Sequence, residues 1–324
     1  MAVNNCFLIG GGSDFPIPSI PQVDTWLTED ATDGINLRLI GVDFTNIEDT
    51  EITIPTELKG KKITEISNNL FNENTNLVRK VVITQPVKII YKSNVKFAGG
   101  VITEIIMNNL DFSLYGVNNY FNIGQAITKL TLVNGFTSNF LPNYCFNNCV
   151  VDLSNINFDK ITRLGNYCFQ GYQTGGNLTF NNVANIEGTE TFKSCNIGEL
   201  NMPNLTKITA SNTFAKSTFK TLKLENLITF TTDSYDRLDC NTLYLTKAEI
   251  VTLQSSNAYN HFNLIKVIYL NHCSNLTLKD SYPTKIQIIY TNTNNVENLK
   301  QLVTTAGYPA LVSKIQNDPR GDQN

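Results

Sequence analysis

The chain has 324 residues and a formal net charge of −3, with 41% apolar and 16% charged residues. The apolar fraction is ample for a folded core. The small acidic charge without any basic run argues against nucleic acid as a partner, because that binding needs clustered Lys and Arg. No stretch reaches the roughly 18 apolar residues of a membrane helix, so we expect no membrane insertion.

Residues 1–22 combine a short apolar run, VNNCFLI, with a Gly-rich break and alternating prolines. Such Gly is flexible and such Pro is extended, so the segment is interpreted as a tether that anchors the protein to an assembly. A first strand folded against the rest is the alternative. The expected anchor residues are Val3, Cys6, Phe7, Leu8 and Ile9. Residues 1–12 lack the basic and apolar regions of an export signal.

Residues 23–50 contain Trp26, an Asp-rich turn and the alternating run INLRLIGVDF. A period of two predicts a strand or a hairpin. We expect this segment to cap the open end of the array that follows, because an uncapped repeat array would expose its apolar cross-section.

Residues 51–290 repeat a short apolar strand, a polar stretch and an aromatic anchor at a period of roughly 23 to 25 residues. This period predicts about 9–10 stacked coils, each covering the apolar face of the next. The expected strand ends are Ile54, Ile83, Met107, Leu132, Leu153, Phe180, Met202, Leu224, Leu245, Leu270 and Ile288. The expected anchors are Phe71, Phe121, Phe146, Phe169, Phe192 and Phe214.

The repeat weakens in two places. Residues 84–120 show no clear anchor, and between 228 and 265 only Tyr235 and Phe262 stand in for one. The register of these coils is therefore open.

Asparagine and cysteine occupy recurring places in the repeat. The 44 Asn residues cluster where the chain must bend, and Asn favours turns because it tolerates left-handed backbone angles. Cys145, Cys149, Cys168 and Cys195 flank successive anchors, which predicts a buried ladder of thiols that act as small apolar residues. A Cys145–Cys168 disulfide is conceivable, whereas thiols in a ladder do not converge on zinc.

Several of these blocks resemble the BspA-like leucine-rich repeat, among them LPNYCFNNC, ITRLGNYCFQGY and VANIEGTETFKSC. An Ile-Pro strand end, an Ile-Gly turn and a Phe-plus-Cys anchor recur in order over about residues 50–290. The resemblance implies a β-rich α/β solenoid with a parallel sheet on one face and short helices or turns on the other. Members of this family are mostly surface adhesins and interaction proteins, and similar arrays occur in phage virion proteins.

Residues 291–324 pass from a strand to a helical pattern, with Asn292 to Asn295 offering a cap. Val296, Leu299, Leu302 and Val303 stand at helical spacing and predict a helical closure of the array. The tail after Gln316 is polar and is expected to be loose. It carries an Arg-Gly-Asp triplet at Arg320 to Asp322, but three residues are weak evidence for integrin binding.

No pattern points to catalysis, a metal or a cofactor. The two histidines, His261 and His272, stand in no metal-binding or triad arrangement. Polysaccharide cleavage by paired acids is the enzymatic alternative, but the candidate acids are scattered over the repeat. These candidates are Asp111, Asp152, Asp159, Glu187, Glu190 and Glu199.

The outward strand positions are expected to form a rigid face for a protein or glycan partner. Tyr244 and Tyr269 are the predicted contact residues, because Tyr combines a large area with a polar tip. We expect a non-enzymatic virion fibre, decoration or host-attachment protein that is cytoplasmic before assembly. The alternative is a surface adhesin of a bacterium or protist.

Overall fold

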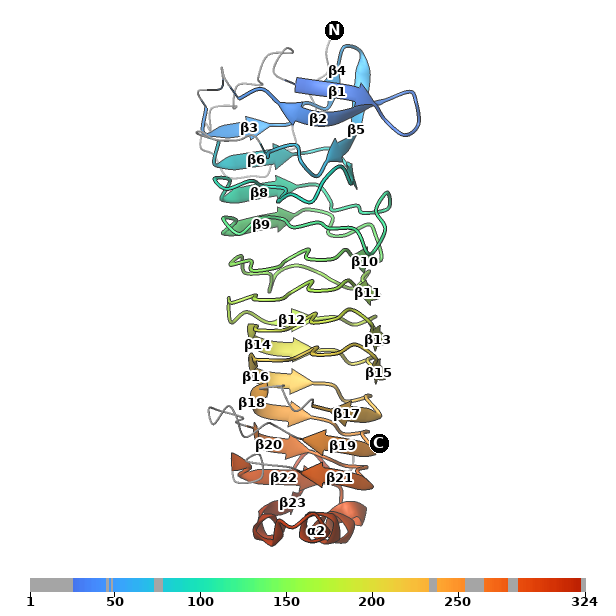
Figure 1. The fold of residues 1–324 in the computed structure, drawn as a ribbon, viewed down its shortest axis with the longest axis vertical. Helices are drawn as coiled ribbons and strands as arrows, with labels where there is room; N and C mark the ends of the chain where they lie inside the picture. Colours follow the sequence, from blue (N-terminus) through green and yellow to red (C-terminus); the bar gives the residue numbers. More distant parts are fainter. Residues whose placement is uncertain are drawn as a thin grey trace.

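The computed structural model describes residues 26–44, 47, 49–72, 78–232, 238–253, 265–278 and 285–321. They form a long parallel β-solenoid of about 11 turns with little helix (Figure 1). The count exceeds the expected 9–10 because strands continue past residue 290. The proposed anchor residues Val3, Cys6, Phe7, Leu8 and Ile9 lie outside the described residues, as do Tyr235, His261 and Phe262.

The first described residues form the expected hairpin at one end of the solenoid. Strands β1 (Trp26–Asp30) and β2 (Leu37–Val42) pair antiparallel, and β2 then runs parallel to β5 (Lys61–Ser67). Strand β5 also pairs with β4 (Glu57–Leu58) and β7 (Lys88–Ile90). Trp26 and alternate residues of β2 are buried, so the hairpin covers apolar surface at the first coils (Figure 1).

The main sheet lies along one flank in two parallel sections. The first section contains β3 (Glu51–Thr53), β6 (Lys80–Ile83), β8 (Glu104–Met107) and β9 (Lys129–Leu132). The second contains β12 (Leu178–Thr179), β14 (Asn196–Asn201), β16 (Ser217–Lys223), β18 (Leu238–Tyr244), β20 (Ile265–Tyr269), β22 (Ile288–Thr291) and β23 (Ile315–Asn317).

The strand ends expected from the repeat of roughly 23 to 25 residues agree closely with the strands of this sheet. Ile83, Met107 and Leu132 end their strands as expected, and most other expected ends directly follow a strand. Leu153 lies in no strand, and Ile288 begins β22 instead of ending it. The two sections therefore meet at a stretch where the coil continues without a strand.

Further short strands line a second flank, where the family resemblance implied helices or turns. The pairs are β10 (Phe140–Leu141) with β11 (Arg163–Leu164), β13 (Asn185–Ile186) with β15 (Lys207–Ile208), and β17 (Thr229–Thr231), β19 (Ile250–Leu253) and β21 (Asn275–Leu278) in a row. All of these pairs are parallel. Each coil thus offers two flat sides to solvent.

A column of phenylalanine rings fills the interior. All six expected anchors are buried, and neighbouring rings stack at coil spacing, with centroids 5.4 Å apart for Phe146–Phe169 and 5.3 Å for Phe169–Phe192. The expectation that residues 84–120 lack an anchor is wrong. Phe97 is fully buried and packs between Phe71 and Phe121, at 5.3 and 5.7 Å.

Polar side chains join each coil to its neighbour at the turns. The hydroxyls of Thr103, Thr128 and Thr206 donate to carbonyl groups one coil earlier, for example Thr206 Oγ1 to Ala184 O at 3.1 Å. Asparagine amides also donate to carbonyl groups of a neighbouring coil, either earlier or later in the chain, which accounts for their abundance at bends. Examples are Asn68, Asn122, Asn143, Asn204 and Asn226.

The thiol ladder is present and reduced. The described cysteines are free and buried, namely Cys145, Cys149, Cys168, Cys195, Cys240 and Cys273; Cys145 and Cys168 thus form no disulfide. Burial raises the thiol pKa of Cys195 and Cys240 to about 12 and that of Cys273 to about 11. These thiols are protonated at neutral pH and serve as packing groups instead of nucleophiles.

The expected helical closure stands at the other end (Figure 1). After the 3₁₀ turn η2 (Thr293–Asn295), helix α2 (Val296–Thr305) buries Leu299 and Val303 at helical spacing. The Asn292 side chain accepts a hydrogen bond from the Asn295 N–H and caps the turn. Turn η3 (Pro309–Lys314) then leads into β23. No helix in the described part of the chain has the length and apolar character to cross a membrane.

The tail after Gln316 is held in place, contrary to expectation, as far as the structure describes it. Strand β23 pairs with β22, the Asp318 N–H donates to Thr291 O at 2.8 Å, and Arg320 forms ion pairs with Asp318 and Glu225. The polar composition of the tail predicted a loosely held segment, but its strand pairing and its ion pair with Glu225 hold it in place.

Candidate functional site

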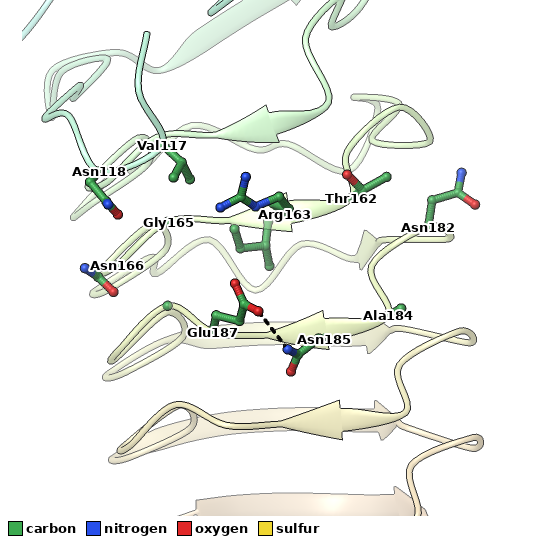
Figure 2. A pocket seen from close by; sticks show the side chains of 12 residues that line it. Val117, Asn118, Thr162, Arg163, Gly165, Asn166, Asn182, Ala184, Asn185 and Glu187 are labelled. Atoms are coloured by element: carbon green, nitrogen blue, oxygen red, sulfur yellow. Dashed lines mark hydrogen bonds between the residues drawn. The ribbon is translucent and has the colours of Figure 1, made fainter.

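A hollow of about 300 Å³ lies on the second flank, across β11 and β13 (Figure 2). Its apolar lining includes Val117, Leu164 and Ala184. Its polar lining includes Asn118, Arg163, Asn166, Asn182, Asn185 and Glu187. We call this site the amide hollow. A larger hollow of about 830 Å³ lies further along the flank and is lined by residues 206–208, 210–214, 228–232 and Leu238.

Strand alternation positions the side chains of the amide hollow. Leu164 and Ile186 point into the core, so Arg163 and Asn185, which precede them on β11 and β13, face outward. The Asn185 amide donates to Glu187 Oε1 at 3.0 Å (Figure 2). The two side chains thereby fix each other's orientation on one coil.

Glycine permits the close stacking of the coils under the hollow. A Cβ on Gly188 would lie 2.5 Å from the Gly165 carbonyl oxygen, well inside contact distance. Any larger residue would push the two coils apart. The floor of the hollow is therefore rigid backbone.

The hollow is rich in hydrogen-bonding groups and poor in net charge. Arg163 is exposed and makes no ion pair within the described residues, and Glu187 is exposed as well. One guanidinium, one carboxylate and several amides offer both donors and acceptors. This set suits a ligand rich in hydroxyl groups better than a strongly charged one.

A stack of tyrosine rings stands at the turns of the same coils; we call Tyr120, Tyr144 and Tyr167 the corner stack. The ring centroids are 5.0 Å apart for Tyr120–Tyr144 and 4.8 Å for Tyr144–Tyr167, the latter pair only 17° from parallel. All three side chains are half-buried. Asn166, which lines the amide hollow, directly precedes Tyr167, so stack and hollow are continuous along the chain.

Two of these tyrosines have left-handed backbone angles, with φ of 64° at Tyr144 and 57° at Tyr167. The corner of the coil requires this angle, since Glu190 and Asn212 at the equivalent positions both have φ of 55°. Bulky residues rarely adopt it, and such strain concentrates at functional sites. Asn would suit the corner better, so its geometry alone does not explain the tyrosines.

The hydroxyl groups of Tyr120 and Tyr144 are neutral at pH 7. Burial, followed by the neighbouring Tyr144, raises the pKa of Tyr120 above its ordinary value. Burial also raises the pKa of Tyr144, with smaller contributions from Tyr167 and Glu190. These two residues therefore present uncharged rings with polar tips.

Tyr244 and Tyr269, the predicted contact residues, lie on the other flank, in the main sheet. They are in register with each other and with Tyr290, and we call these three residues the face stack. The Tyr244 and Tyr269 rings lie 4.4 Å apart and 9° from parallel. Both residues end strands of the main sheet, and their role in binding stays a prediction.

Arg320 covers the face stack. Its guanidinium carbon lies 4.2 Å from the Tyr269 ring centroid and 4.8 Å from that of Tyr244. Tyr269 is only 8% exposed, and burial, then Tyr244, raises its pKa to about 12. The arginine of the Arg-Gly-Asp triplet is thus engaged within the chain.

Asp318 anchors this arrangement. Burial raises the pKa of its carboxyl, but hydrogen bonds from Arg320 and Asn271 outweigh that effect, and the pKa lies below its ordinary value. The carboxylate is therefore ionised at neutral pH and forms an ion pair with Arg320 at 2.8 Å. This pair closes the cover over the rings.

The candidate acids are not gathered into one site. Glu190 and Glu199 form ion pairs with Lys193 and Lys223, at 2.7 and 2.9 Å. Within the described residues, no group of three or more His, Cys, Asp or Glu is placed to hold a metal ion. Glu187 is the one candidate acid that lines the amide hollow.

The sequence patterns do not predict the amide hollow or the corner stack. The Cys and Phe of the repeated Asn-Tyr-Cys-Phe motif at residues 143–146 and 166–169 predict the thiol ladder and the ring column. The Tyr of the same motif, recurring two positions before each anchor, is the available signal for the corner stack.

Comparison with known proteins supports the repeat. Residues 139–276 match six copies of the BspA type leucine rich repeat region. The leucine rich repeat protein of T. pallidum, seen in a crystal structure, is 11% identical with a TM-score of 0.31, over 61% of this chain and 89% of that one. No curated protein matches the chain. Residues 139–276 of the solenoid thus consist of six BspA-type leucine-rich repeats.

Proposed function

We propose that this protein is a non-enzymatic recognition module whose second flank binds a glycan at the amide hollow and the corner stack. The observation that carries the proposal is the continuity of half-exposed tyrosine rings with amide and guanidinium groups on the same coils. Ring faces pack against the C–H faces of sugars, and amides pair with hydroxyl groups.

The composition of the hollow favours a glycan over a protein partner. Protein interfaces draw most of their binding energy from apolar and aromatic anchors in desolvated pockets. Asn166, Asn182 and Asn185 instead line this hollow with amides. The coils hold these groups on rigid backbone, so little ordering entropy is lost on binding.

The acids favour binding without cleavage. Glycoside hydrolysis ordinarily requires two carboxyl groups roughly 5 to 10 Å apart. Glu187 lines the hollow and is bonded to Asn185, and no second acid joins it in the lining that the structure describes. Polysaccharide cleavage remains the enzymatic alternative.

A glycan array followed by calorimetric titration of the best ligand tests the proposal. We expect Tyr167→Ala to weaken binding by about two- to tenfold, since a lost aromatic contact is worth about 0.5–1.5 kcal/mol. Tyr91→Ala, in an exposed tyrosine of an earlier coil, is the matched control and should leave binding unchanged.

Three outcomes would contradict the proposal: no glycan binds, Tyr91→Ala weakens binding as much as Tyr167→Ala, or the bound glycan releases reducing ends with time. The last result would establish the cleavage alternative. Capture of a protein partner that tolerates Tyr167→Ala, without any glycan binding, would make the module a protein-binding one.

The assembly that carries the module is part of the same proposal. The array type, together with the apolar, Gly-rich and Pro-rich sequence of residues 1–22, supports a virion fibre, decoration or host-attachment protein. A bacterial or protist surface adhesin is the alternative. Immunogold electron microscopy of native particles and cells separates the two hypotheses. Label mainly on virions supports the virion protein, and label mainly on cell envelopes supports the adhesin.

A further inference from the structure

We propose that the face stack, together with Glu225 and Asp318, is a binding site for an arginine side chain, which Arg320 of the same chain now fills and which a partner's arginine enters by displacing it. The site lies on the main sheet, on a different flank from the amide hollow. It is therefore independent of the proposed glycan binding.

The aromatic half of the site fits a planar cation. Tyr244 and Tyr269 are nearly parallel at 4.4 Å and lie under one guanidinium group, with Arg320 Cζ within 4.8 Å of both ring centroids. A guanidinium over tyrosine rings gains cation–π attraction and is less strongly hydrated than an ammonium group. The rings thus favour arginine over lysine.

The acidic half of the site fixes the guanidinium fork. Arg320 Nη2 and Nε donate to Asp318 Oδ2 and Oδ1 at 2.8 and 3.1 Å, and Nη1 donates to Glu225 Oε1 at 3.2 Å. Two parallel N–H bonds to one carboxylate are specific to arginine. Lysine carries a single ammonium group and cannot reproduce this geometry.

The site is prepared by residues other than its occupant. Asp318 is 6% exposed and also accepts a hydrogen bond from Asn271 Nδ2 at 3.3 Å. A buried ionised carboxylate needs a cation, so removing Arg320 leaves a site that attracts another one. The Asn271 Oδ1 atom is buried without a hydrogen-bond partner in the described structure, which leaves an acceptor in the same cluster for a further N–H donor.

The site is also open on one side. The Glu225 side chain is 42% exposed, and that of Arg320 is 30% exposed. The ion pair with Glu225, at such exposure, holds weakly against water, whereas the Asp318 carboxylate is the buried part of the site. Arg320 therefore competes with a partner's arginine for the same site. Its effective concentration at the site sets the affinity that the partner's arginine needs in order to displace it.

The test titrates full-length wild-type, Arg320→Ala and Arg320→Lys proteins with a blocked Gly-Arg-Gly peptide and its Gly-Lys-Gly counterpart, followed by NMR. We expect Arg320→Ala to bind the arginine peptide about tenfold or more tightly than the wild type, because the tethered competitor is gone. It should prefer arginine to lysine, and Glu225→Gln in the same background should weaken the binding.

Arg320→Lys keeps a cation beside Asp318 in case Arg320→Ala loosens the last coils, and it should also bind the arginine peptide more tightly than the wild type. Equal binding by all three folded proteins, or equal affinity for the two peptides, would overturn the proposal. Glycan binding should be the same in all three, so failure here leaves the proposed function intact, and the reverse also holds.

Discussion

Two kinds of aromatic column run along this solenoid, one inside and one outside. Phe169 and Phe192 stack inside at 5.3 Å and 9° and are fully buried. Tyr244 and Tyr269 stack outside at 4.4 Å and the same angle. The repeat imposes similar stacking in both places, so the environment decides what the rings do. Inside, the rings exclude water and stabilise the fold; outside, they lie under the Arg320 guanidinium group.

The largest expected effect comes from breaking the inner column. Phe169→Ala removes a ring that contacts Phe146, Phe180 and Phe192. We expect the free energy of unfolding to fall by about 3 to 5 kcal/mol, as for other buried Phe truncations. Urea denaturation monitored by circular dichroism measures it, and an unchanged midpoint would show that the inner column does not carry stability.

A second prediction concerns the thiols beside the inner column. Unfolded thiols titrate near pH 8.5, whereas burial raises the pKa of Cys195 to about 12. Between these values the unfolded chain loses a proton that the native chain keeps, so stability falls as pH rises. The slope is about 1.4 kcal/mol per pH unit for each such thiol, and below pH 8 the effect is absent.

Cys195→Ala is the matched variant for this prediction. Its free energy of unfolding, followed from pH 8 to 11, should decline more shallowly than that of the wild type by about 1.4 kcal/mol per pH unit. Parallel curves would mean that the Cys195 thiol is accessible and titrates normally in the folded protein.

The corner stack should contribute much less to stability than the inner column. Tyr167→Asn removes one ring but places a residue that tolerates a left-handed backbone, and φ here is 57°. We expect the free energy of unfolding to change by less than about 1 kcal/mol, because lost stacking and relieved strain offset each other. A loss as large as that of Phe169→Ala in the same urea assay would erase the distinction between the columns.

The smallest expected effect lies on the outer face near the start of the array. Glu51, Lys80, Glu104 and Lys129 alternate in register across four strands, and Lys80 pairs with Glu51 at 2.8 Å. Lys80→Gln should cost about 0.5 kcal/mol or less, because partly exposed ion pairs contribute little. Thermal melts at low and high salt provide the measurement; a salt-insensitive loss above about 1 kcal/mol would contradict it.

The sequence located the coils because their apolar positions recur at a fixed spacing. It named Ile83 and Met107 as strand ends, and both are. It missed the Phe97 anchor, which is followed by Ala98 and Gly99 where the coil at Phe146 has Asn147 and Asn148. Gly99 nevertheless takes the left-handed angle, with φ of 60°, that Asn148 takes after Phe146. Backbone geometry, not residue type, is what repeats there.

The surface sites were less predictable, since they depend on residues from different coils. The amide hollow combines Asn118 with Asn185 across several coils, and no local pattern links the two. The cover on Tyr269 comes from Arg320, 51 positions further along the chain, and its charge partner Glu225 stands 95 positions before Arg320. The strand pattern in a single sequence identifies outward positions. It does not show which distant residues of the chain cover those positions.

The threonine bonds at the turns have a consequence for how such a chain evolves. The Thr128 and Thr206 hydroxyls each reach back by a single coil, so these bonds join only neighbouring coils. Duplication or loss of a whole unit in the gene then creates just one new junction, made from parts that already fit. The reach of the rod can lengthen or shorten over generations without a redesign of its interior.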